Sequence, residues 1–219
     1  GLSVGPTTQF ARLTHAQYDR TIADLLELGP DAPRFSADFR SDASAGSYPY
    51  DNASEVLNLD PGLRRGYERA AEAIALMILD DAALFARLVP PGATDAARAR
   101  TFVEGFGARV HRRPLTSAQI GEYMALFQIG VTAYEDAPGL EGGIRMLVEA
   151  LLTSPYFLYR VELSGDEVGG VVRLDDWEIA SRLSYTLWDT MPDTGLFDAA
   201  QAGRLKRPAA DQRVTTILV

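Results

Sequence analysis

Imidazole and thiol chemistry is sparse in this chain. The 219 residues include two histidines and no cysteine, so they offer no disulfide, zinc–thiolate site, iron–sulfur cluster, cysteine nucleophile or covalent attachment point for haem. A serine hydrolase formed by these residues alone would need His15 or His111 as its base. Neither lies in a sequence context typical of such enzymes, and no phosphate loop, G-x-S-x-G turn or H-E-x-x-H pair is present. We expect His15, in the first turn of a predicted helix, to be solvated.

His111 lies among arginines. Arg109, Arg112 and Arg113 surround it in sequence, and their positive charge is expected to keep the imidazole neutral. A neutral imidazole can be an axial ligand of haem iron, although we favour a structural role. The three arginines could bind an anion, such as a haem propionate, a phosphate or a carboxylate, through paired hydrogen bonds. We favour the alternative, in which they pair with acids of this acidic chain and brace the turn before Pro114.

A second candidate site lies near the C-terminal end of a predicted helix after residue 175. Arg182, Tyr185 and Asp189 are spaced three and four residues apart, so they share one helix face, with Trp188 beside them. This face could be the wall of a pocket with an internal arginine–carboxylate pair, or a polar seam that holds helices together. We favour the seam. A hydrolase with paired carboxylates is the third choice, because the spacing singles out no pair of acids.

A long polar segment between the first two predicted helices carries interleaved aromatic residues. Residues 31–58 show no helical period and are rich in serine, glycine and aspartate, and the aromatic residues are Phe35, Phe39, Tyr48 and Tyr50. We expect this loop to be held against the body of the protein. Loops of this length are often functional.

The end of this loop contains the candidate binding residues Tyr50, Asp51 and Asn52. The two Asx side chains could instead cap the turn that follows, and we favour that interpretation. Asp38, Asp42 and Asp51 lack the spacing of a calcium loop, so we predict no metal site.

The sequence predicts an all-α fold, whose helices would position the candidate residues. Apolar residues recur at helical spacing, and capping residues mark the starts of most helices. The predicted helices begin near Thr14, Asp60, Asp81, Thr94, Thr116, Leu140, Asp175 or Asp176, Asp193 and Pro208. The segment 165–176 is expected to form at most one small β-hairpin.

The break Val89–Pro90–Pro91–Gly92 is a candidate boundary between two packed helical subdomains. We therefore expect a flexible tail over residues 1–9, an N-terminal helical subdomain over 10–90 and a second over 91–219. The last predicted helix is still apolar at Ile217–Val219. Because an apolar helix end normally packs on something, we expect further polypeptide to belong to this fold.

The charge balance constrains the partners. The chain has 21 basic and 30 acidic residues, a net charge of −9, which argues against binding to nucleic acid or to an anionic membrane. No apolar run approaches the roughly 20 residues of a membrane helix, so we predict a soluble chain without membrane insertion.

Five segments, taken in order, resemble a known group of proteins. They are RLTHAQYDRTIADLLEL, YDNASEVLNL, FVEGFGARVHRRPLT, LLTSPYFLYRVE and VVRLDDWEIASRLSYTLWDTMPD. This series is similar to large secreted proteins of planctomycetes and myxobacteria that contain serial domains of unknown function, with domain fifteen-ninety-two at the centre. The resemblance covers about residues 10–218. At the position of His111 that family commonly has tyrosine, which argues against a role as an iron ligand.

The resemblance implies a location and a cofactor. Proteins of this group usually continue into domains with a CxxCH motif, the attachment site of c-type haem. It therefore implies a periplasmic or extracellular protein whose haem c is carried outside this chain, with His111, Arg112 and Arg113 as the residues here that could contact the haem. The remainder of the polypeptide and a redox partner are the implied partners.

Two function classes follow. The first is the helical N-terminal part of a haem-associated protein that acts in electron transfer or oxidises an extracellular substrate. The second is a non-catalytic extracellular helical module that binds a polysaccharide or a partner protein through the aromatic loop from Phe35 to Tyr50.

Overall fold

A computed structural model describes residues 10–29, 31–40, 60–162, 167–168, 171–172 and 174–206. These residues form nine helices and two small antiparallel sheets, so the predicted all-α class is confirmed. The helices are α1 (His15–Leu25), α2 (Pro61–Asp80), α3 (Ala82–Leu88), α4 (Asp95–His111), α5 (Ser117–Ala133), α6 (Leu140–Leu152), α7 (Pro155–Leu158), α8 (Asp176–Leu187) and α9 (Thr194–Gln201).

Most helices begin where their capping residues predict. Thr14 and Thr116 form capping boxes with the glutamine three residues later, at the starts of α1 and α5. Asp175 forms a third, with Glu178, and so is the N-cap of α8. These side chains accept hydrogen bonds from backbone amides that a helix leaves without partners at its first turn.

The prediction of at most one hairpin is confirmed for the described residues, and a further small sheet was not predicted. The hairpin of β3 (Glu167–Val168) and β4 (Val171–Val172) is present. A second sheet pairs β1 (Phe10–Arg12) with β2 (Tyr159–Val161), with Ala11 opposite Arg160. Strands of three residues are too short to show an alternating pattern, so their pairing has no clear signal in the sequence.

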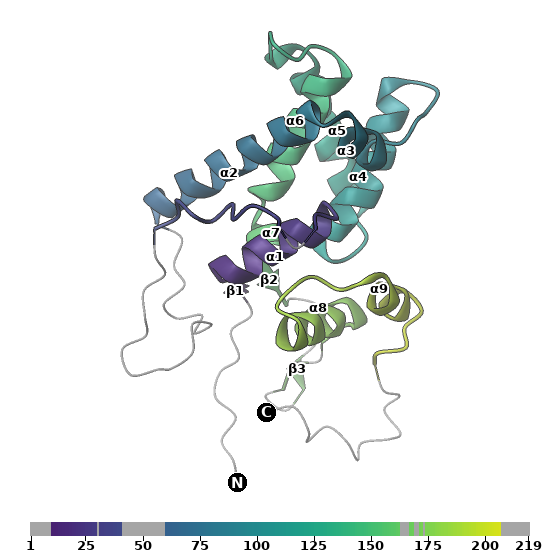
Figure 1. Ribbon diagram of the computed structural model, residues 1–219. Coiled ribbons are helices and arrows are strands. Elements are labelled where there is room, and N and C mark those ends of the chain that lie inside the picture. The colour runs from purple at the N-terminus through teal and green to yellow at the C-terminus, as the bar shows by residue number, and fades with distance from the viewer. Residues whose placement is uncertain are drawn as a thin grey trace.

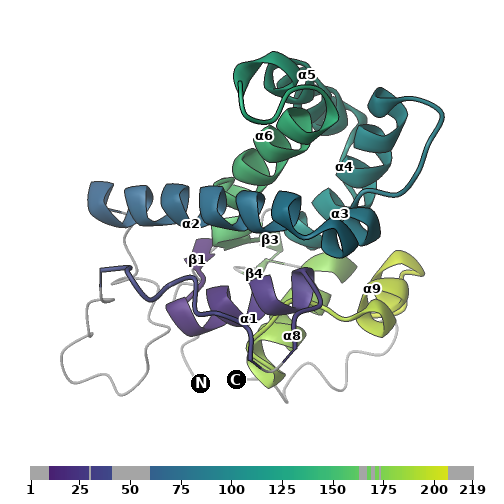
Figure 2. The ribbon, with the colours of Figure 1, turned by 45° about the horizontal axis from the view of Figure 1, so that its top comes forward.

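The larger group of helices is arranged around α6, and α1 and α8 lie beside that group (Figures 1 and 2). The long helix α2 crosses α6, α5 runs beside α6, and α4 packs against both α5 and α6. In both views α1 lies between this group and α8, which contacts β2 and α9. The first described helix, α1, and the late helix α8 therefore lie near one another.

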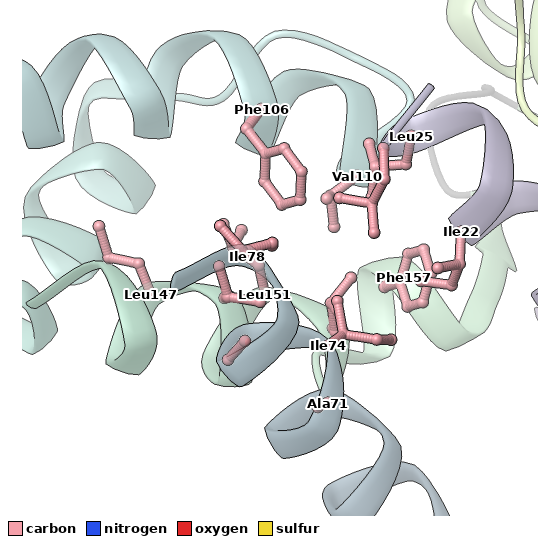
Figure 3. Close-up of a cluster of buried hydrophobic side chains, with 14 of the residues drawn as sticks. Ile22, Leu25, Ala71, Ile74, Ile78, Phe106, Val110, Leu147, Leu151 and Phe157 are labelled. Carbon is pink, nitrogen blue, oxygen red and sulfur yellow. The ribbon is translucent and has the colours of Figure 1, made fainter. Parts of the chain in front are cut away.

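A hydrophobic core joins helices α1 to α7 (Figure 3). Ile22 of α1, Ile74 of α2, Val110 of α4 and Leu151 of α6 point toward one another, with Phe157 of α7 beside them. The predicted boundary near residue 90 thus separates helices that contribute side chains to the same buried cluster.

Glycines allow α5 and α6 to approach closely. A Cβ atom at Gly130 of α5 would lie 2.6 Å from the carbonyl oxygen of Gly142 and 2.6 Å from Cβ of Met146. A Cβ atom at Gly143 would meet the ring of Phe127. Side chains at these positions would therefore force the two helices apart.

Several predictions fall outside the described residues: the tail 1–9, the aromatic residues Tyr48 and Tyr50, and the helix expected after Pro208. Across the ranges that the structure does describe, no helix combines the length and the apolar character needed to cross a bilayer.

Candidate functional site

Arg112 ends α4 and ties it to the chain that follows α6. Its backbone is left-handed, with φ of 57°, and its side chain is buried, with the residue 4% exposed. Nη2 donates to the carbonyl oxygens of Tyr156 (2.7 Å), Phe157 (3.0 Å) and Tyr159 (2.7 Å). A buried guanidinium needs such acceptors to offset the cost of removing it from water.

Tyr185 connects α8 to the same arginine. Its hydroxyl accepts from Nη1 of Arg112 at 3.2 Å and lies 3.0 Å from Oγ1 of Thr21 on α1. The guanidinium groups of Arg112 and Arg160 lie 5.4 and 5.6 Å from the centre of its ring. These contacts form a polar seam between α1, α4 and α8, which is the arrangement that the sequence favoured for Tyr185.

His111 lies at the edge of this seam. It is 6% exposed, its Nε2 lies 2.9 Å from the hydroxyl of Tyr123, and its ring stacks on Tyr156. Burial and then the charges of Arg112 and Arg113 lower the pKa of His111 from 6.5 to about 4. The predicted neutral imidazole is therefore confirmed.

The three arginines differ in their partners. Arg113 forms an ion pair with Asp175 at 2.5 Å, and Arg109 with Glu27 at 3.6 Å, as expected for an acidic chain. For Arg112 the expected pairing with acids was wrong, because its donors reach backbone carbonyls and a tyrosine hydroxyl instead.

The cavity beside the residues proposed to contact haem is too small to enclose that group. His111, Arg112 and Arg113 line a cavity of about 30 Å³ together with Trp177, Glu178 and others. That volume holds one or two waters, whereas pockets for cofactors are roughly 300–1,000 Å³. A water there suits His111, whose buried Nδ1 has no hydrogen-bond partner among the described residues.

The predicted face of Arg182, Tyr185 and Asp189 is divided between different partners. Arg182 makes two hydrogen bonds to the carboxylate of Glu162. The helix ends at Leu187, and Asp189 has a φ of 55°, so the chain turns away. An internal pair of Arg182 with Asp189 is therefore not formed.

Trp188 lies exposed at this turn. It is 52% exposed, and it follows Leu187, which is 63% exposed. Trp188 lines a hollow of about 520 Å³ together with Asp19, Arg20 and Asp24 of α1 and residues of the loop after it. A second hollow, of about 540 Å³, is lined also by Asp24, Arg109, Thr190, Met191, Pro192, Asp193, Thr194, Phe197 and Asp198. We call the two hollows together the Trp188 groove.

The turn that carries Trp188 is fixed to α1. Asp189 accepts from Arg20 at 2.6 Å and from Nε2 of Gln17 at 3.3 Å. Thr190 donates to the carboxylate of Asp24. The left-handed conformation of Asp189 costs free energy and persists because these contacts hold it. Trp188 is thus presented at the end of α8, and the two residues that follow it are anchored to α1.

The groove has an excess of negative charge. Its two guanidinium groups are occupied, since Arg20 pairs with Asp189 and Arg109 with Glu27. The lining acids Asp24, Asp193 and Asp198 have no ion-pair partner among the described residues, and the carboxylate of Asp198 has no hydrogen bond there either.

The described part of the aromatic loop packs inward. The ring of Phe39 lies 4.8 Å from that of Tyr67 and 5.3 Å from that of Tyr18, and Phe35 packs against the core. The prediction that the loop is held down is confirmed for these two residues. The expectation of a solvated His15 was wrong, because its half-buried ring lies edge-on to Phe39 at 5.3 Å.

Other candidates are outside the described residues or were missed. Tyr50, Asp51 and Asn52 lie in the range that is not described. Sequence reasoning selected Trp188 and Asp189 but missed Thr190, which follows them directly, and Asp24 and Asp198, which become neighbours of Trp188 only through folding. In the described ranges, no three histidine or acidic side chains gather as a metal site.

Three family models match the chain in order. Residues 11–79 match PSD3, a protein of unknown function (DUF1587), residues 98–162 match PSD5 (DUF1595), and residues 174–219 match PSD4 (DUF1592). The resemblance to domain fifteen-ninety-two and its companion domains is thereby confirmed at the level of domains. No curated protein and no solved structure matches the chain.

The three matched regions can be placed on the fold and on the Trp188 groove. The break at residues 89–92 lies between the first and second regions, and the β3–β4 hairpin lies between the second and third. The Trp188 groove is formed mainly by the first region, through α1, and by the third, through the turn after α8.

Proposed function

We propose that this chain is a non-catalytic helical module that binds a polysaccharide in the Trp188 groove. The observation that carries the proposal is an exposed indole, next to a turn that is anchored to α1, that lines two sizeable hollows. Large exposed aromatic side chains beside a hollow are typical of binding sites.

The chemistry of the lining suits a sugar. A pyranose ring has an apolar face, which can lie on an indole, and a rim of hydroxyl groups, which need hydrogen-bond partners. Carboxylates and a hydroxyl supply those partners in the groove, from Asp24, Asp193, Asp198 and Thr190. Both hollows are open to solvent, so a polymer can extend beyond them.

The binding surface differs from the one that the sequence favoured. Phe35 and Phe39 contribute to the packing of the body, whereas Trp188 faces solvent. Neither histidine lines the groove, and the polar groups of the seam hold helices together. These features support binding as the role of the groove.

Retention on insoluble polysaccharides tests this function. We expect the purified chain to be retained by at least one polymer of a panel of glucans, xylans and hexosamine polymers. Trp188→Ala should lower retention at least tenfold, because stacking on one large ring contributes about 1–2 kcal/mol or more at such sites. Trp188→Phe, which keeps an aromatic ring, should restore part of it. Equal retention of wild type and Trp188→Ala, or no retention on any polymer, contradicts the proposal.

The haem-linked redox role and the exported location remain separate predictions that rest on the resemblance. The matches to the three domains support the domain order on which that resemblance rests. Intact mass and the visible spectrum of the full-length protein test the cofactor. A Soret band with a covalent haem mass supports the redox role, and a colourless species without that mass contradicts it.

A further inference from the structure

We propose that the polysaccharide of the Trp188 groove is cationic: a polymer of amino sugars with free ammonium groups. This inference rests on the proposed function and specifies its ligand. The carrying observation is that the acids around the indole outnumber the cations available to neutralise them.

The cations of the groove are already occupied. Arg20 lies 2.6 Å from Asp189, and Arg109 lies 3.6 Å from Glu27 while it also donates to the backbone carbonyl of Asp24 at 2.8 Å. Neither guanidinium is therefore free to balance an anionic sugar. A sulfated or carboxylated polymer would add negative charge to an acidic surface and be repelled.

The carboxylate oxygens of Asp193 and Asp198 in the groove can still accept hydrogen bonds. Asp198 is exposed, and its carboxylate has no hydrogen bond or ion pair among the described residues. Asp193 uses Oδ1 to cap α9 at the amide of Leu196, which leaves its second oxygen open. An ammonium group donates three hydrogen bonds and matches such carboxylates better than a neutral hydroxyl does.

The indole also attracts a positively charged group. A cation beside the face of tryptophan is attracted by the negative charge of the ring face, more strongly than beside tyrosine or phenylalanine. Trp188 and Asp24 line both hollows. An ammonium group in either hollow therefore has both an aromatic ring and a carboxylate in its surroundings.

The shape of the groove favours sugar rings over a basic peptide. The hollows, about 520 and 540 Å³, are nearly equal in volume and share Trp188, Asp24 and Thr190 in their linings. Two adjoining hollows of similar volume suit neighbouring sugar rings of one polymer. A lysine side chain is a thin four-carbon stem, which is held best by a narrow channel.

Competing hexamers test the inference. Calorimetric titration at low salt would compare hexamers of glucosamine, N-acetylglucosamine and glucose, with hexalysine as a peptide probe. Glucosamine and N-acetylglucosamine share the ring and differ in the ammonium charge. We expect the glucosamine hexamer to bind at least fivefold more tightly, and to lose that advantage as salt screens the charges.

Variants that each remove one acidic charge test whether the groove carboxylates cause the preference for the charged hexamer. Asp198→Asn should weaken the glucosamine hexamer about threefold, as expected for one exposed charge, and leave the acetylated hexamer unchanged. Glu135→Gln is the matched control, since it removes one exposed acid from the segment between α5 and α6, far from α8 and α9 (Figure 1). It should change neither affinity.

The other possible results contradict either the cationic preference or the proposed function. Equal binding of the charged and neutral hexamers overturns the cationic preference while the proposed function stands. Hexalysine that binds as tightly as the glucosamine hexamer, and depends equally on Trp188, overturns it in favour of a peptide ligand. No binding of any sugar contradicts the proposed function itself.

Discussion

Buried polar side chains in this protein differ in how well their hydrogen-bonding groups are satisfied. Arg112 has four oxygen acceptors within 3.2 Å. Tyr18 is fully buried, and its hydroxyl has no partner among the described residues, so burial raises the pKa of Tyr18. His111 is intermediate, with one ring nitrogen paired and the other not. The energetic consequences of replacing these residues should therefore differ in sign as well as in size.

Tyr18→Phe should leave the free energy of unfolding unchanged or raise it by up to about 1 kcal/mol, because it removes a buried hydroxyl that forms no hydrogen bond. Tyr67→Phe is the matched control. It removes a hydroxyl that accepts from Nη1 of Arg12 at 2.6 Å, and it should cost about 2 kcal/mol. Urea denaturation of both variants measures the difference, and a loss above about 1 kcal/mol for Tyr18→Phe contradicts this prediction.

His111 makes stability depend on pH. Its pKa in the folded chain is about 4, against an ordinary 6.5, so the unfolded chain takes up the proton first as pH falls. The contribution of His111 to the free energy of unfolding should be constant above about pH 6.5. It should then decrease by about 3 kcal/mol as pH falls to 4.

His111→Gln keeps an amide that can reach Tyr123 but does not titrate. The difference between wild type and this variant in the pH dependence of unfolding isolates the histidine from the carboxylates. Parallel curves between pH 4 and 6.5 would show that the imidazole is not kept neutral by its surroundings.

At the scale of elements, α8 is attached to the body through polar contacts more than through apolar ones. Its Tyr185 meets Arg112 of α4 and Thr21 of α1, and Arg113 pairs with the capping residue Asp175. Removal of Arg112 should therefore release α8 before the helices of the main core.

Arg112→Lys should cost about 3 kcal/mol, because an ammonium group on a flexible stem cannot reproduce the forked contacts of a guanidinium and leaves buried acceptors without donors. Hydrogen exchange should show faster opening of α8 than of α6. Arg182→Lys is the control, since its exposed pair with Glu162 should contribute no more than about 1 kcal/mol. Similar losses for the two variants would contradict the role of Arg112.

The close contact of α5 with α6 can be tested by two glycine substitutions on α5. Gly130→Ala should destabilise the protein by about 1–3 kcal/mol, because its Cβ would overlap the backbone of α6. Gly121→Ala, on the same helix with no atom within 4 Å of the new Cβ, should stabilise it by about 0.5–1 kcal/mol. Thermal denaturation of the pair checks the sign, and a stabilising Gly130→Ala would show that the helices can separate at no cost.

Helix starts could be predicted because their signals are local. The capping box of Thr14 and Gln17 lies within four residues and forms as expected. The pairing of β1 with β2 joins strands about 150 residues apart, and strands this short leave no periodic pattern. The ion pair of Asp189 was not predictable either, because its partner Arg20 is far away in the sequence. The two side chains meet only when the chain has folded.

At the scale of the whole molecule, three regions that match separate families share one structure. A common core joins the first two, and the polar seam attaches the third. The exposed Trp188 lies at the junction of the first and third regions. The candidate site thus depends on the assembly of these regions, which explains why local patterns selected Trp188 but not the acids around it.

Fluorescence of Trp188 tests the central claim most directly. Trp177→Phe keeps an aromatic ring against Phe197 and leaves Trp188 as the one tryptophan of the chain. Titration of this variant with the polysaccharide that retains the wild type should give a saturable change in the emission of Trp188, at the concentrations where retention saturates. Retention with an unchanged Trp188 emission would place binding elsewhere on the chain and contradict the groove as the site.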